Sequence, residues 1–195
     1  RKDPAVQAEI DRSATVTPSG VERFGLFTII VLGEVIVGVV QGVAGQPINL
    51  LIGGSAALGM LIAIGIWWIY FDYVSHRIPI NTKVSTYGWM YLHLPMTMCI
   101  AAGGAAVLNV IEHSGQHLPA EVSWLLVGSL AIALASVALL MRIIQIPKKY
   151  RKYYLRGSVV TLFSGIFIAL LGLLKLDILL LLVMMNLFMF APIIY

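Results

Sequence analysis

An acidic residue, Glu34, lies near the middle of the apolar stretch Glu22 to Val43. That stretch is long enough to cross a bilayer as a helix, which takes about 20 apolar residues. A charged side chain at the centre of such a helix costs roughly 2.5–3.5 kcal/mol, so it normally faces protein or water. At 100° per residue, Glu34 belongs to one helical stripe, which we expect to face the bundle interior. The stripe consists of Arg23, Phe27, Ile30, Glu34, Gly38 and Gln41.

A second candidate is His93, in the run from Trp89 to Pro95. Pro95 has no N–H, so it is expected to break the helix and leave the carbonyl of Tyr91 without its helical donor. Two interpretations of His93 follow. It could form only a hydrogen bond between helices, or it could line one cavity with Glu34 as a protonatable pair, with Tyr91 beside it. The predicted binding or transport residues are Glu34, His93, Tyr91 and Gln41.

Arg23 needs a partner nearer than Glu34. Asp72 follows the aromatic run from Trp67, and Trp and Tyr favour the membrane interface, so Asp72 and Arg23 are expected at the same depth. We predict a structural ion pair between Arg23 and Asp72, for which Glu22 competes.

The sequence shows no phosphate-binding loop and no HExxH, CxxC or GxSxG motif. Neither a catalytic activity nor a cofactor is therefore predicted. His113 and His117 are spaced like metal ligands on a helix, but Gly115 between them argues against a metal site. The single cysteine, Cys99, is interpreted as a small apolar filler.

The elements that must position these residues are apolar helices. The chain has 195 residues, of which 59% are hydrophobic and 11% charged, and its mean hydropathy is +0.93. This composition predicts an all-α, polytopic transmembrane bundle of about six spans. A polar lead-in, 1–20, precedes a transmembrane domain, 21–195. The last span is the shortest and the most open to being partial or peripheral. The expected spans are Val21–Val43, Leu50–Phe71, Tyr87–Val110, Val122–Met141, Gly157–Leu174 and Ile178–Ile194.

In a six-span arrangement every Lys and Arg except Lys175 falls on one side, so both termini are predicted in the cytoplasm. The basic residues beside the spans indicate contact with membrane lipids rather than nucleic acid. The predicted lipid-facing cations are Lys148, Lys149, Arg151 and Lys152.

Three motifs carry a resemblance to a known family: the stretch Val21 to Glu34, the run Trp67 to Asp72, and Tyr91 to Pro95. In this order they closely resemble the landmarks of the bacterial low-temperature-requirement A family. The resemblance implies a bacterial inner-membrane protein linked by name to growth in the cold, and a chain that corresponds to the carboxy-terminal half of a family protein or to a shortened member. The motif positions are Glu22, Arg23, Gly33, Glu34, Trp68, Asp72, Tyr91, His93 and Pro95.

Three functions are compatible with these residues. The first is a transporter or channel with a protonatable site at Glu34 and His93. The second is a structural or partner-binding membrane protein, its partner being the missing amino-terminal half or another copy of the chain. The third, weakly favoured by the basic, tyrosine-rich stretch from Lys148 to Arg156, is an enzyme that modifies a lipid or isoprenoid.

Overall fold

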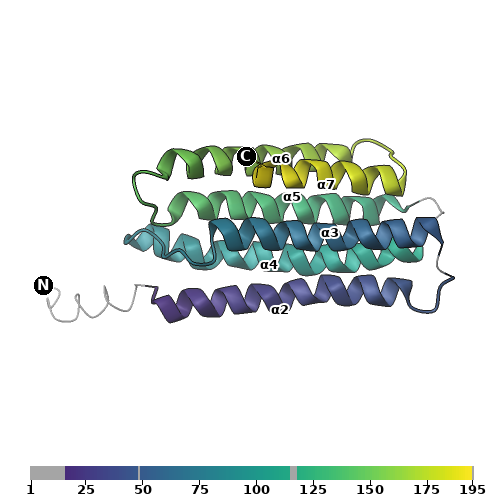
Figure 1. Ribbon diagram of the computed structural model, residues 1–195, viewed down its shortest axis with the longest axis horizontal. Coiled ribbons are helices and arrows are strands. Elements are labelled where there is room, and N and C mark those ends of the chain that lie inside the picture. The colour runs from purple at the N-terminus through teal and green to yellow at the C-terminus, as the bar shows by residue number, and fades with distance from the viewer. Residues whose placement is uncertain (1–15, 48, 115–117, 195) are drawn as a thin grey trace, which may run out of the picture.

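The computed structural model describes residues 16–47, 49–114 and 118–194, and within these ranges the regular elements are all helices (Figure 1). The lead-in is thus largely outside the described residues. The helices lie side by side along one common direction, as expected for a transmembrane bundle. They are α2 (Pro18–Val43), α3 (Leu50–Tyr73), α4 (Lys83–Glu112), α5 (Ala120–Ile143), α6 (Arg151–Leu171) and α7 (Ile178–Ile194).

Five of these helices are long and apolar enough to span a bilayer, which confirms the predicted all-α membrane fold. The sixth, α7, has only 17 residues and is the short segment that the sequence indicates. It packs against α3 and α6 and buries Leu182, Met185 and Met189 there.

Three helices begin where a polar side chain accepts a hydrogen bond from their own first turn. Thr17 accepts from the N–H of Gly20 at 3.2 Å, and Asn49 accepts from Ile52 at 2.9 Å. Thr82 accepts from Ser85 at 3.1 Å. These caps satisfy backbone donors that have no partner inside the helix. The cap at Thr82 also explains why α4 begins at Lys83 rather than at Tyr87, where apolar character starts.

Helix α2 lies at one edge of the bundle and packs against α3 and α4, whereas α6 and α7 form the opposite edge (Figure 1). The contact between α2 and α4 depends on glycine. A Cβ added to Gly38 would lie 2.8 Å from the carbonyl oxygen of Gly104, and one added to Gly104 would lie 3.1 Å from Cα of Val35. The two backbones approach this closely only because both residues lack side chains.

Two loops meet through main-chain groups at the end of the bundle predicted to be cytoplasmic. The N–H of Ile80 donates to the carbonyl of Ile143 at 2.8 Å, and the N–H of Gln145 donates to the carbonyl of Ile78 at 2.8 Å. The loop between α3 and α4 is thereby fastened to the loop between α5 and α6.

Candidate functional site

His93 lies buried between three helices, with 1% of its surface exposed. Its Nδ1 lies 2.7 Å from the carbonyl oxygen of Trp89, and its Nε2 lies 3.0 Å from the hydroxyl of Tyr70 on α3. A carbonyl oxygen can only accept, so Nδ1 carries the proton in the neutral imidazole. Nε2 is then an acceptor, and Tyr70 donates to it. The arrangement is a satisfied hydrogen bond between helices, the first of the two interpretations above.

Aromatic rings enclose His93 on its other sides. The ring centroids of Phe24, on α2, and Trp89 lie 4.8 and 4.4 Å from that of His93. The Trp89 side chain is fully buried, and its Nε1–H has no hydrogen-bond partner among the described residues. This aromatic cluster, made of Phe24, Tyr70, Trp89 and His93, joins α2, α3 and α4 near their predicted cytoplasmic ends.

Pro95 does not break α4, which is helical from Lys83 through Glu112. The hydroxyl of Thr97 supports the chain here, since it donates to the carbonyls of His93 at 2.8 Å and Leu94 at 3.1 Å. Proline is tolerated in membrane helices where side chains and neighbouring helices compensate for the lost bond. Tyr91 does not lie beside His93 in a cavity, because 71% of its surface is exposed.

Glu34 does not face the bundle interior as predicted. Its side chain is exposed, and it forms no hydrogen bond or ion pair with the described residues. The backbone of Glu34 lies at the level of Gly104, which is 11 positions beyond His93 on α4 and therefore about 16 Å away along the axis. The structure thus separates the proposed pair, with Glu34 outside the bundle and His93 inside it.

The predicted stripe does not form the buried face of α2. Phe27, Ile30 and Gln41 are exposed together with Glu34, and of the stripe residues only Gly38 is buried. Small residues mark the face that packs, because they let α2 approach α4 closely. The buried residues of α2 are Val21, Gly25, Thr28, Leu32, Val35, Gly38, Val39 and Gly42.

The described residues contain no ion pair between Arg23 and Asp72, and both side chains are exposed. The prediction of equal depth holds, because a Cβ on Gly25 would lie 4.0 Å from the ring of Phe71, next to Asp72.

Of the two histidines that are spaced like metal ligands, His117 lies outside the described residues. His113 places its Nδ1 2.8 Å from the carbonyl oxygen of Asn109. No group of three or more His, Cys, Asp or Glu side chains within the described ranges could hold a metal ion.

Sequence reasoning missed two tyrosines that the structure makes central. Tyr70 binds His93, and the Tyr73 hydroxyl donates to the carbonyl of Pro192 at 3.0 Å and lies 3.0 Å from the hydroxyl of Tyr153. The available signal was their spacing, since Ile66, Ile69, Tyr70 and Tyr73 recur at helical intervals and are all buried.

The fold and these contacts define a multi-pass helical membrane protein. The chain belongs to the LtrA family: residues 4–192 match the bacterial low temperature requirement A protein (LtrA). The match covers nearly the whole chain and extends well beyond the three motifs that carry the resemblance. No curated protein and no solved structure matches the chain.

Proposed function

We propose that this LtrA family member works as part of an assembly in the bacterial cytoplasmic membrane, in which the outer face of α2 contacts a second copy of the chain. The observation that carries this proposal is the exposed carboxyl group of Glu34 in an otherwise apolar span. Lipid offers that group no partner, at a cost of a few kcal/mol. A protein surface at the same depth would remove this cost.

A second copy is favoured as the partner by symmetry. A two-fold axis along the membrane normal places both Glu34 side chains at one depth. Two adjacent carboxyl groups can share one proton, which neutralises half of their charge and gives each a hydrogen bond. The surface around Glu34 is free for such a contact, because α2 lies at the edge of the bundle and Ile30, one turn earlier, is 67% exposed (Figure 1).

Cysteine cross-linking in native membranes tests this assembly. In a Cys99→Ser background, Ile30→Cys should cross-link between copies with a short bismaleimide. The matched control is Phe163→Cys on α6, which is 54% exposed at the opposite edge. Equal cross-linking at the two positions would refute an interface on α2.

Transport is the finer function that we propose for this assembly, with Glu34 as the group that takes up and releases a proton. Two observations favour placing it at the interface: Glu34 lies outside the bundle, and a cavity among α2, α3, α4 and α5 measures only about 10 Å³. Proteoliposomes loaded with a pH-sensitive dye test the proposal. Proton flux should fall at least tenfold in Glu34→Gln and persist in Tyr91→Phe, which changes an exposed side chain of α4.

Assembly through α2 and proton transport through Glu34 can be tested separately. Cross-linking at Ile30 without any wild-type flux would support the partner-binding function and reject transport. Flux that survives Glu34→Gln would remove Glu34 from the transport step. We propose no enzymatic activity for the protein. We also propose that both termini lie in the cytoplasm. The exposed cations there are proposed to contact membrane lipids; they are Lys148, Lys149, Arg151 and Lys152.

A further inference from the structure

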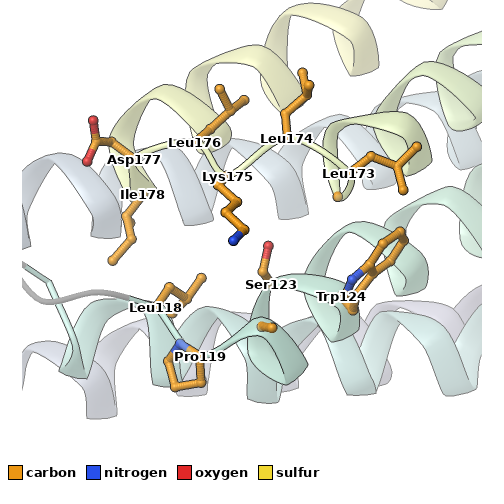
Figure 2. A pocket seen from close by; sticks show the side chains of 12 residues that line it. Leu118, Pro119, Ser123, Trp124, Leu173, Leu174, Lys175, Leu176, Asp177 and Ile178 are labelled. Atoms are coloured by element: carbon orange, nitrogen blue, oxygen red, sulfur yellow. The ribbon is translucent and has the colours of Figure 1, made fainter.

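A hollow of about 540 Å³ lies at the end of the bundle opposite the basic loop. The first turn of α5 forms one wall, and the turn between α6 and α7 forms the other (Figure 2). Apolar side chains make up most of the lining, among them Leu118, Trp124, Leu173 and Leu174. Trp124, Leu173 and Leu174 are 46%, 67% and 54% exposed, so the hollow opens toward the surroundings of the bundle.

One cation is aimed into this hollow. The ammonium group of Lys175 points toward the hydroxyl of Ser123, whereas the carboxylate of Asp177 points away from both (Figure 2). Lys175 forms no hydrogen bond or ion pair with the described residues. Glu121, the acid in the first turn of α5, does not line the hollow. Asp177 is the acidic residue among those that line the hollow, and because its carboxylate turns outward, Lys175 is the charge that points into the interior.

The backbone adds to this polarity. The N-cap of α5 is Pro119, and no side chain caps the helix there. The first N–H groups of the 24-residue helix thus lie beside the hollow and carry the positive end of its dipole. The hydroxyl of Ser123 is a further hydrogen-bond donor on the same wall. Together with Lys175, these groups suit an anion with several acceptor oxygens.

We infer that this hollow binds the phosphate headgroup of an anionic phospholipid, with Lys175 and Ser123 on the phosphate and Trp124 and Leu173 along the adjoining glycerol and acyl chain. The apolar walls are the reason for choosing a lipid over free phosphate, which would leave them exposed. Tryptophan and lysine are also the residues that favour the headgroup level of a bilayer. The site is independent of Glu34 and of the basic loop.

Native mass spectrometry of the detergent-purified protein tests the inference. Phosphatidylglycerol and phosphatidylcholine are added in matched series, and bound lipid is counted. The wild type should retain phosphatidylglycerol preferentially. Lys175→Gln should weaken that retention about fivefold, which corresponds to one cation near a membrane surface. The control is Arg23→Gln, which removes an exposed cation at the other end of the bundle and should keep the wild-type preference.

Three results would overturn the inference. The first is equal retention of the two lipids, and the second is an equal loss in Lys175→Gln and Arg23→Gln. The third is displacement of the bound lipid by millimolar inorganic phosphate, which would show that a free anion occupies the hollow. Lys175→Arg serves as a second variant, and it should restore retention because it restores the charge.

Discussion

The hydroxyl of Tyr70 lies 3.0 Å from Nε2 of His93, and this bond joins α3 to α4 inside the bundle. His93 is also held by its own helix through the carbonyl of Trp89. Both ring nitrogens therefore form hydrogen bonds within the protein, so His93 has no free nitrogen with which to bind a solute. The bond is a structural link between two spans.

Tyr70→Phe should lower the free energy of unfolding by about 0.6 kcal/mol and by no more than about 1.7 kcal/mol, the average and the maximum measured for hydrogen bonds between membrane helices. The loss arises because Nε2 of His93 stays buried without a donor. Unfolding in mixed micelles measures it, with Tyr91→Phe as the control on an exposed side chain. An equal effect of both substitutions would contradict the structural role of the bond.

Gly38→Ala should destabilise the protein by about 1–3 kcal/mol, because the new methyl group must displace the backbone of Gly104. Gly33→Ala is the matched control on the same helix, since an added Cβ there meets nothing within 4 Å. Alanine also favours the helix over glycine, so the control should be neutral or slightly stabilising. Thermal denaturation of both variants checks the difference, and identical midpoints would argue against the close approach of α2 and α4.

Arg23→Asp and Asp72→Arg should show no coupling. The structure places both side chains in exposed positions without a bond between them. The effect of the double variant on stability should therefore equal the sum of the single effects within about 0.5 kcal/mol. If the double variant were more stable than the single variants, that result would support the ion pair that the sequence predicts.

Tyr73→Phe should cost about 1 kcal/mol, since it removes the hydroxyl that donates to the carbonyl of Pro192 on α7. The variant should also loosen α7, which proteolysis of the purified protein would detect as earlier cleavage. Tyr150→Phe, at a tyrosine that is 49% exposed, supplies the comparison. Equal cleavage rates would show that the bond from Tyr73 does not hold α7 in place.

Fold class, helix positions and the short last span followed from hydropathy, because lipid leaves the backbone few alternatives. The orientation of each helix face did not follow. On α2 the apolar residues outside the bundle resemble those inside it, so side-chain polarity does not distinguish the buried face from the exposed one. The single acid, Glu34, therefore pointed to the wrong face. The informative residues were Gly38 and Gly42, whose four-residue spacing marks a packing surface.

The sequence also does not reveal which side chains on different helices contact one another. Arg23 and Asp72 were paired on depth alone, and depth proved right, but the rotation of each helix decides whether side chains meet. His93 was recognised as polar and buried, whereas its partner Tyr70 was lost among the aromatic residues of the run Trp67 to Tyr73. A hydroxyl at the rim of a ring gives no signal in a hydropathy profile.

The link between Ile78–Ile80 and Ile143–Gln145 has an evolutionary consequence. It is made by peptide N–H and C=O groups, which nearly every amino acid supplies. Changes in the side chains of these two loops leave the two main-chain bonds intact, and a change at Gln145 removes only its side-chain bond to the carbonyl of Pro79 at 2.9 Å. A proline at position 80 or 145 would remove one of the main-chain donors. The position of these two loops relative to each other is therefore fixed by the backbone and tolerates most changes of side chain.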